Sequence, residues 1–339
     1  MSRPDTRMPR EEAEALVARV LEANRVSARN AESVARALVA AEIDGQAGHG
    51  FSRVAAYAAQ ARSGKVSGAA CPVAEQAGTA RIDIDARNGF AFPAVDLAIE
   101  KLAELVPETG VAVATIRRSH HCGQLGAHVE RLAERGIAAL MVANTPKAMA
   151  PWGGNAALFG TNPIAFAAPR GEARPPLVID LSLSKVARGK VMAAAKSGTP
   201  IPEGWALDAD GNPTTDPEAA LKGTMVPAGD AKGAALALVV EILAATLTGA
   251  KHSSEASSFF DAEGEPPGVG QLIMAFDTSR VAGEGFTLRL EALLAAVLGQ
   301  EGTRLPGEKR IAGRRAVREG EGVLVPGHLL EEIEALAGV

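Results

Sequence analysis

Cysteine is scarce in this sequence of 339 residues, and long hydrophobic segments are missing. The two cysteines, Cys71 and Cys122, lie far apart and match no zinc-binding spacing, which argues against a disulfide scaffold and favours a reducing cytoplasm. The longest apolar run, 233–249, contains Glu241 and is shorter than the ~20 residues of a membrane span, so we expect a buried helix there. Residues 1–15 lack the apolar core of a signal peptide. We therefore predict a soluble cytoplasmic protein without membrane contact.

Excess positive charge is also absent. The formal net charge is −5 and the isoelectric point is near 5.8, which argues against a general nucleic-acid-binding protein. The only short basic cluster is too small for a duplex footprint; it consists of Arg310, Arg314, Arg315 and Arg318. The histidines show neither ligand spacing nor carboxylate partners, so we predict no metal site.

The sequence lacks both common nucleotide-binding fingerprints. No strand is followed by G-x-G-x-x-G, and G-x-x-x-x-G-K-[ST] does not occur, so a standard dinucleotide fold or a P-loop has no support. In their place stand six glycine-bearing turns: "HHCGQLG", "PWGGN", "LFGTNP", "ARGK", "AGDAKG" and "LPGEKR". Glycine permits close approach of the backbone to a ligand. Each motif alone is typical of a tight turn, but together they favour a ligand held by loops.

The first part of the chain has helical periodicity. Apolar stripes predict helices over 9–44, divided near the N-cap candidate Ser27, and a third helix over 51–63 that ends at Gly64. The pattern then changes to alternating strands and helices. "GVAVATI" (110–116) and "IAALMVANT" (137–145) are expected to form a parallel pair with a right-handed crossover.

Further strands are expected in "ARIDIDA", "PLVIDLSLS" and "GQLIMAF". The segments 187–232 and 250–268 are rich in Gly, Pro and Asp and are predicted to be long loops. Loops of that length in a compact protein are usually functional.

The stretch "DGQAGHGFSRVAAY" (44–57) holds His49, Arg53 and the only tyrosine, Tyr57. Residues four apart share a helix face, so Arg53 and Tyr57 line up behind His49. A helix start favours the neutral form of a histidine, and an arginine can bind a carboxylate through two parallel hydrogen bonds. This pattern suits chemistry at the carbon beside a carboxylate. The alternative is a loop histidine that caps a helix and an arginine in a surface ion pair.

Several blocks, in order along nearly the whole chain, resemble one family. They are "DGQAGHGFSRVAAY", "SHHCGQLGAHVERLAERG", "APWGGNAALFGTNPIAFAAP", "VIDLSLSKVARGK", "GWALDADGNPTTDP", "AGDAKGAALALVVEILAATLTGA" and "LPGEKR". The family is the malate/L-lactate dehydrogenase type of NAD(P)-dependent oxidoreductases, which includes sulfolactate and ureidoglycolate dehydrogenases and cyclic-imine 2-carboxylate reductases.

The resemblance implies a non-Rossmann α/β fold. A mixed-sheet α/β region over 76–299 is expected to bind cofactor and substrate. A helical domain over 1–75, joined by 300–339, is expected beside it, and two chains are expected to form a homodimer.

The resemblance also assigns residues to roles. It implies that His49 is the proton donor, with His121 as a second candidate, that Arg53 binds the substrate carboxylate, and that Thr161 contacts the substrate. The implied cofactor is NAD or NADP, and the sequence does not decide between them. The implied cofactor-binding residues are His121, Cys122, Gly123, Gln124 and Leu125; Ile179, Asp180 and Leu181; Asp230, Ala231, Lys232 and Gly233; and Leu305, Pro306, Gly307, Glu308, Lys309, Arg310 and Ile311.

Two departures from the family pattern bear on the substrate. Many relatives have a serine before the catalytic histidine, where this chain has Gly48, and the cyclic-imine reductases have an aspartate where this chain reads Arg188-Gly189-Lys190. These departures argue against an imine substrate, and the "GHG" form resembles the sulfolactate branch. Arg188 and Lys147 are additional cations in the predicted site loops, although a solvated lysine and an ion-paired arginine are alternatives.

We therefore predict reversible hydride transfer at C2 of a small 2-oxo or 2-hydroxy acid. A dianion of the malate or sulfolactate type is favoured over lactate. Two alternatives remain open: a cyclic-imine 2-carboxylate reductase, and a non-catalytic member that binds the cofactor.

Overall fold

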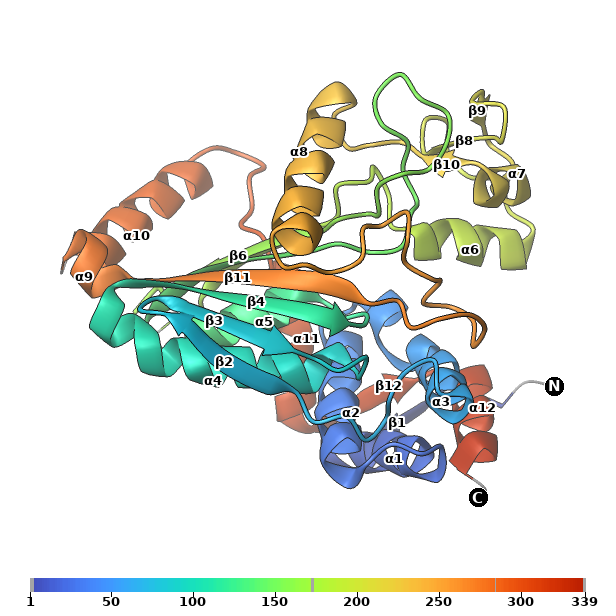
Figure 1. Cartoon of the computed structure of the whole chain (residues 1–339), viewed down its shortest axis with the longest axis horizontal. Helices are drawn as coiled ribbons and strands as arrows, with labels where there is room; N and C mark the ends of the chain where they lie inside the picture. Colours follow the sequence, from blue (N-terminus) through green and yellow to red (C-terminus); the bar gives the residue numbers. More distant parts are fainter. Residues whose placement is uncertain (1–2, 172–173, 284, 338–339) are drawn as a thin grey trace.

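A mixed seven-stranded sheet forms the centre of the molecule (Figure 1). The computed structural model describes residues 3–171, 174–283 and 285–337. Within them, β3 and β4 pair in parallel and every other neighbouring pair in this sheet is antiparallel. The strand order is β2 (Val73–Gly78), β3 (Arg81–Asp85), β4 (Val111–Ser119), β11 (Val269–Asp277), β5 (Ile137–Ala143), β6 (Ile164–Ala168) and β7 (Leu177–Leu181).

The expected pairing of the strands over 110–116 and 137–145 is wrong. β4 and β5 point in the same direction, but β11 lies between them and is antiparallel to both. The adjacent parallel pair is β3 and β4, connected through α4 (Ala91–Thr109). Local periodicity identifies these strands but carries no information about a strand inserted from far along the chain.

Two faces of the sheet are covered by different elements. α4 packs on β3, β4 and β11, and α5 (Leu125–Ala133) packs on β5, β6 and β7, so both helices bury one face. On the opposite face lies α8 (Ala231–Glu241), which continues into a π-helical turn, η3 (Ile242–Thr246) (Figure 1). Ile273 of β11 faces the side of the sheet covered by α4 and α5. Its neighbour Leu272 faces the side covered by α8 and η3, as strand alternation requires.

A helical part packs against one end of the sheet. It contains α1 (Arg10–Ala23), α2 (Ala28–Ile43) and α3 (Val54–Ser63), and the C-terminal α12 (Gly327–Ala337) packs on α1 and α3. A two-stranded ribbon joins the ends of the chain, with β1 (Thr6–Met8) antiparallel to β12 (Val323–Val325). α11 (Glu308–Ala316) and the π turn η4 (Val317–Glu321) lead into this ribbon. One apolar core includes Leu21, Leu38, Tyr57, Val325 and Ile333, so both ends of the chain contribute to it.

The segment 187–232 is a small lobe and not the long loop that composition predicts. It contains α6 (Arg188–Ser197), α7 (Pro217–Lys222) and a three-stranded sheet of β8 (Ala206–Leu207), β9 (Pro213–Thr214) and β10 (Thr224–Met225). Strands this short leave little periodic pattern to detect. Segment 250–268 contains neither helix nor strand, as expected.

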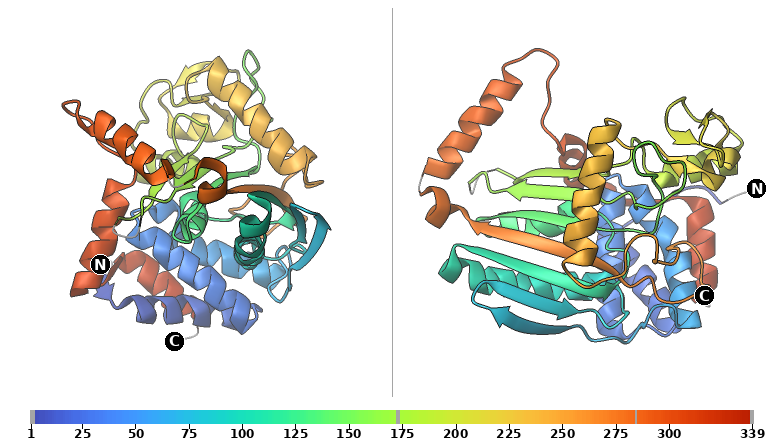
Figure 2. Two further views of the ribbon diagram at one scale, coloured as in Figure 1. Left: turned by 90° about the vertical axis from the view of Figure 1, so that its left-hand side faces the viewer. Right: turned by 45° about the horizontal axis from the view of Figure 1, so that its top comes forward.

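The apolar run 233–249 is not the buried helix that its composition suggests. Leu236, Leu238, Val239 and Ile242 are about half exposed, because only one side of α8 packs on the sheet. A second apolar helix, α10 (Gly285–Leu298), follows the short α9 (Thr278–Ala282) and stands away from the body (Figure 2). Leu288 of α10 is 76% exposed. Among the described residues, no helix is both long and apolar enough to cross a membrane.

Candidate active site

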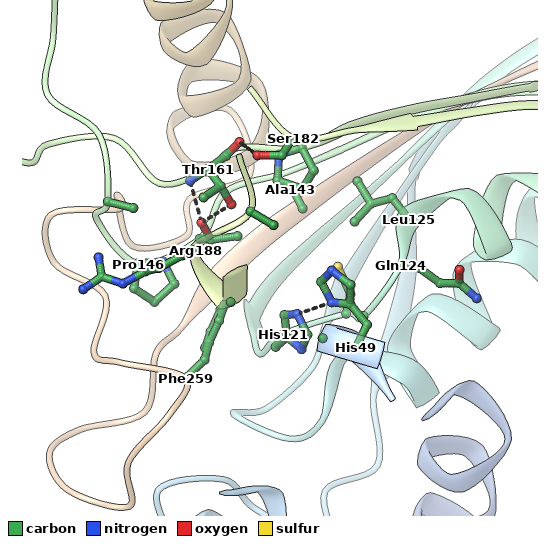
Figure 3. Close-up of a pocket in the computed structure, with 18 of the residues that line it drawn as sticks. His49, His121, Gln124, Leu125, Ala143, Pro146, Thr161, Ser182, Arg188 and Phe259 are labelled. Atoms are coloured by element: carbon green, nitrogen blue, oxygen red, sulfur yellow. Dashed lines mark hydrogen bonds between the residues drawn. The ribbon is translucent and has the colours of Figure 1, made fainter. Parts of the chain in front are cut away.

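A pocket of about 440 Å³ lies where the helical part, the sheet and the small lobe meet. Figure 3 shows His49 and His121 on one side of it and Arg188, Thr161 and Pro146 across from them. The sequence predicts His49, His121, Thr161 and Arg188 from segments far apart in the chain, and the fold brings these four to one cavity.

The turn that carries His49 is held by the half-buried carboxylate of Glu42. The Phe51 N–H donates to Glu42 Oε2 at 3.0 Å, and a Cβ on Gly50 would lie 1.8 Å from the same oxygen, which explains the glycine. Two 3₁₀ turns, η1 (Ala47–His49) and η2 (Phe51–Arg53), precede α3. The expected helix start at residue 51 is therefore displaced to Val54, and His49 does not sit at an α-helix N-terminus.

The histidine is nevertheless held neutral. Burial, with a smaller contribution from the positive charge of Arg53, lowers the pKa of His49 to about 4. Burial also holds the pKa of His121 well below its ordinary value, and the positive charge of Arg53 lowers this pKa further. Both imidazoles are thus uncharged at neutral pH, for a different physical reason from the helix dipole that the sequence suggested.

His49 and His121 contact each other directly. Their rings stack with centroids 5.1 Å apart, and His49 Nδ1 lies 3.1 Å from His121 Nε2. The other nitrogen of His121, Nδ1, lies 2.5 Å from the Tyr57 hydroxyl. His121 therefore has both nitrogens engaged, whereas no hydrogen bond to His49 Nε2 arises within residues 3–171, 174–283 and 285–337.

Arg53 is a buried cation with a free donor. Its Nε donates to the Gly48 carbonyl at 2.7 Å, and its guanidinium lies 4.4 Å from the centre of the Phe260 ring. One terminal nitrogen is buried without a hydrogen-bond partner among the residues that the structure describes. A buried unpaired guanidinium N–H is costly unless an acceptor reaches it, so a carboxylate in the pocket would satisfy it.

The facing wall contains hydroxyl groups and a second arginine. The Thr161 N–H donates to Thr145 Oγ1 at 2.9 Å, and the two hydroxyls are 3.3 Å apart. Arg188, at the start of α6, lines the pocket and is mostly buried, which lowers its pKa. It makes one long contact of 3.4 Å with the Leu221 carbonyl. Lys147 also lines the pocket but is exposed.

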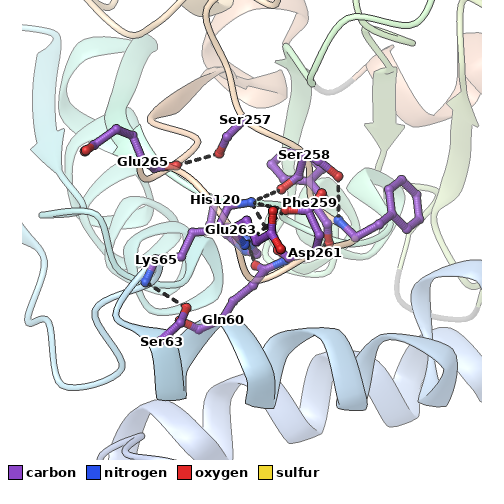
Figure 4. A network of polar contacts seen from close by, with 11 residues as sticks. Gln60, Ser63, Lys65, His120, Ser257, Ser258, Phe259, Asp261, Glu263 and Glu265 are labelled. Atoms are coloured by element: carbon purple, nitrogen blue, oxygen red, sulfur yellow. Dashed lines mark hydrogen bonds and ion pairs between the residues drawn. The ribbon is translucent and has the colours of Figure 1, made fainter.

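A loop over 252–261 closes the pocket beside Arg53. We call it the strap. Lys65 is almost fully buried and donates to the carbonyls of Ser258 and Asp261 and to the Asp261 carboxylate, at 2.8, 3.0 and 2.9 Å (Figure 4). Gln60 Nε2 donates to the Phe259 carbonyl at 2.9 Å. These contacts fix Phe259 against His121 and Phe260 against Arg53.

The predicted cofactor segments divide into two groups. His121, Cys122, Gly123, Gln124 and Leu125 line the pocket together with Asp180 and Leu181. Ile179 is half-buried beside them and does not line it. The segments Asp230–Gly233 and Leu305–Ile311 do not line it either. The cofactor roles of these residues remain predictions.

The first turn of α5 is not open to an anion. The Gly126 N–H donates to Asp180 Oδ2 at 2.7 Å, so a carboxylate already occupies this position. Burial raises the pKa of Asp180. The hydrogen bond from the Gly126 N–H and the positive charge of Arg310 lower this pKa and so offset part of the increase. Arg310 itself has two buried nitrogens without hydrogen-bond partners in the described chain and contacts Glu130 at 3.6 Å. An unsatisfied cation beside this end of the pocket fits an anionic cofactor such as a dinucleotide.

Three contributors were not assigned roles from the sequence. They are Thr145, which follows buried strand β5, and the strap residues Phe259 and Phe260. A polar residue directly after a buried strand was the available indication for Thr145. Nothing local indicates that the strap reaches His121.

Comparison with known proteins agrees with this geometry. The family model described as malate/L-lactate dehydrogenase matches residues 8–334. The chain belongs to the malate/L-lactate dehydrogenase family. Within this family, the chain is 55% identical to a (2R)-3-sulfolactate dehydrogenase (NADP(+)) of Chromohalobacter salexigens, over 96% of each chain. It is 40% identical to a Delta(1)-pyrroline-2-carboxylate/Delta(1)-piperideine-2-carboxylate reductase of Pseudomonas putida, over 100% of each.

A solved structure of the same family has the same fold. The sulfolactate dehydrogenase from Methanocaldococcus jannaschii superposes with a TM-score of 0.89 at 28% identity, covering 98% of this chain and 97% of that one. The mixed-sheet α/β fold without a Rossmann domain is therefore confirmed.

Proposed function

We propose that this member of the malate/L-lactate dehydrogenase family is an NADP-dependent dehydrogenase of a small dianionic 2-hydroxy acid of the sulfolactate type. The observation that carries the proposal is the pair of mostly buried arginines, Arg53 and Arg188, that line one pocket with His49. One guanidinium suits the C1 carboxylate and the other suits a second anionic group such as a sulfonate. The 55% identity to an enzyme named for (2R)-3-sulfolactate and NADP(+) supports it.

The side chains divide the chemical work. Arg53 binds the carboxylate with its free terminal nitrogen, and Thr161 donates a hydrogen bond to the substrate. His49 holds a proton at the nitrogen that faces the pocket, where the C2 oxygen needs it to become a hydroxyl. His121 has both nitrogens engaged, so His49 is the better proton donor of the two. The strap excludes water.

The cofactor would lie along Gln124, Leu125 and Asp180, with Arg310 as a partner for its phosphates. When bound, it supplies the hydride.

The cyclic-imine reductase alternative has weaker support. In this chain the position before His49 is Gly48, and Arg188 and Gly189 line the pocket where an acidic residue is expected in those reductases. A cation there suits an anionic group and not an iminium carbon.

A reduced-cofactor absorbance assay tests the proposal. We expect oxidation of NADPH with sulfopyruvate and oxaloacetate, lower rates with pyruvate, and lower rates with NADH. Activity on piperideine-2-carboxylate alone would instead select the imine reductase, and no activity on any of the four would favour a non-catalytic member.

Arg188→Ala should discriminate between substrates. Because it removes one charge-assisted contact worth about 1.5–3 kcal/mol, we expect kcat/KM for sulfopyruvate and oxaloacetate to fall about 10- to 100-fold, while kcat/KM for pyruvate changes little. Lys190→Ala is the matched control, because it removes an exposed charge from the same helix outside the pocket. Equal losses for dianions and pyruvate would contradict the assignment of Arg188.

We also propose a homodimer formed through α8 and α10, in a cytoplasmic location. The exposed leucines of these helices support an apolar interface, and free cysteines at 71 and 122 suit a reducing compartment.

Leu293→Arg on α10 should give a monomer. A charge buried in an apolar interface is costly, so light scattering should show a shift from twice 34.8 kDa to 34.8 kDa, with unchanged circular dichroism. Lys190→Ala, at an exposed position outside α8 and α10, should leave the mass unchanged. A wild-type protein that is already monomeric at micromolar concentration would overturn the dimer.

A further inference from the structure

Three side chains, Tyr57, His121 and His49, form an unbroken line of hydrogen bonds that ends at the pocket. Tyr57 Oη lies 2.5 Å from His121 Nδ1, and His121 Nε2 lies 3.1 Å from His49 Nδ1 (Figure 3 shows the second contact). Tyr57 is fully buried at the back of the line, and His49 is at its front, among the residues that line the pocket. The two imidazole rings are tilted by only 16° to each other, and this arrangement holds His121 Nε2 opposite His49 Nδ1.

The number of protons determines the direction of both hydrogen bonds. A neutral imidazole carries one N–H and one acceptor nitrogen. The Tyr57 hydroxyl makes no other hydrogen bond within the described residues, so its proton is best placed on the line to His121 Nδ1. His121 must then carry its own proton on Nε2 and donate it to His49 Nδ1. The single proton of His49 is thereby left on Nε2.

No carboxylate takes part in this arrangement. In the described chain, neither ring of the pair accepts from or donates to an aspartate or glutamate. Histidines that act on substrates usually need a partner on their second nitrogen to select one tautomer. Here that partner is a phenol acting through a second imidazole.

We propose that Tyr57 is a positioning residue that acts through His121 to fix the tautomer of His49, with its N–H on Nε2 and directed into the pocket. The tautomer itself is a property of the folded chain. Its use in catalysis rests on the proposed function, in which that N–H faces the C2 oxygen of the oxo acid.

Nitrogen-15 NMR of histidine-labelled protein reads the tautomer directly at pH 7.5. Two-bond proton–nitrogen correlations should show a protonated Nε2 and a bare Nδ1 for His49, with the signals assigned by their loss in His49→Gln. In Tyr57→Phe, which removes only the hydroxyl, we expect a mixture of tautomers at both histidines. A wild-type His49 protonated on Nδ1 would overturn the proposal whatever the activity.

Kinetics give the second readout. In Tyr57→Phe we expect kcat for sulfopyruvate reduction to fall about tenfold or more, within the range of general acid–base effects, while KM for the oxo acid stays within about threefold. Ser33→Ala, which removes a buried hydroxyl bonded to Asp96 outside the site, should leave kcat and tautomers unchanged. An unchanged kcat in Tyr57→Phe would remove the positioning role. Expected tautomers in a protein that reduces no oxo acid would instead refute the proposed function alone.

Discussion

His49→Gln should reduce kcat for sulfopyruvate about 10²- to 10⁴-fold, the range that a positioned acid or base contributes. The glutamine amide can occupy similar space and contact His121, but it cannot transfer a proton at neutral pH. Because Arg53 and Arg188 remain in place, KM for the oxo acid should change much less than kcat. Steady-state kinetics with NADPH held constant would measure both parameters.

A fall in kcat can be assigned to loss of the proton donor only if the His49→Gln variant folds normally. His49 is held by one hydrogen bond to His121 and does not belong to a core cluster, so the free energy of unfolding should change little. His328→Gln, at an exposed position of α12, is the matched control and should keep full activity. A kcat within threefold of wild type in His49→Gln would transfer the proton-donor role to another group, with His121 the first to test.

The helices of the N-terminal part were predictable because each buries one stripe of apolar side chains. Leu16, Val17 and Val20 of α1 and Val34 and Leu38 of α2 recur at helical spacing, and all are buried. The break near Ser27 also agrees with the structure, where α2 begins at residue 28. Local patterns of this kind record which face of an element meets the core.

Elements defined by long-range contacts were not predictable in the same way. The position of β11 between β4 and β5 depends on the packing of the whole sheet, and β1 is stabilised by pairing with β12 at the other end of the chain. The exposed sides of α8 and α10 are apolar and therefore look like core in the sequence. Apolar periodicity cannot tell a surface that packs within one chain from a surface that packs on another molecule.

The candidate site also combines residues that a local pattern predicts with residues that only long-range contacts bring together. His49 and Arg53 share one short segment, so their spacing alone suggested a joint role. His121, which hydrogen-bonds His49, comes from the loop after β4, and the strap that covers Arg53 is anchored by Lys65. The family resemblance supplied His121, but no local pattern indicated that it would bridge Tyr57 and His49.

Burial of four histidines has a consequence for stability. Burial lowers the pKa of His49 to about 4 and of His120 to about 3, and it also lowers the pKa of His121 and His128. In the unfolded chain these groups have pKa values near 6.5. Below pH 6.5 the unfolded state therefore binds more protons than the folded state, and the free energy of unfolding falls as the pH falls.

The opposite contribution comes from three carboxyl groups. Burial raises the pKa of Glu42, Glu134 and Asp180, so these groups bind protons in the folded state first and offset part of the loss. The lowered pKa values of Asp96 and Asp85 add to acid instability only at still lower pH. The histidines should dominate between pH 6.5 and 5, because each contributes up to about 1.4 kcal/mol per pH unit.

We therefore expect the free energy of unfolding, measured by urea titration, to be constant from pH 8 to 7 and to fall by several kcal/mol between pH 6.5 and 5. Such a loss is comparable with the about 5–15 kcal/mol that stabilises a typical protein, so the protein should unfold near pH 5. His128→Gln, which can keep the hydrogen bond to the Cys122 carbonyl, should lower the slope by up to one proton. His328→Gln should leave the slope unchanged, because His328 is exposed. A free energy of unfolding that is flat down to pH 5 would mean that the four imidazoles are charged or hydrated in the folded protein, and the neutral histidine pair in the pocket would be wrong as well.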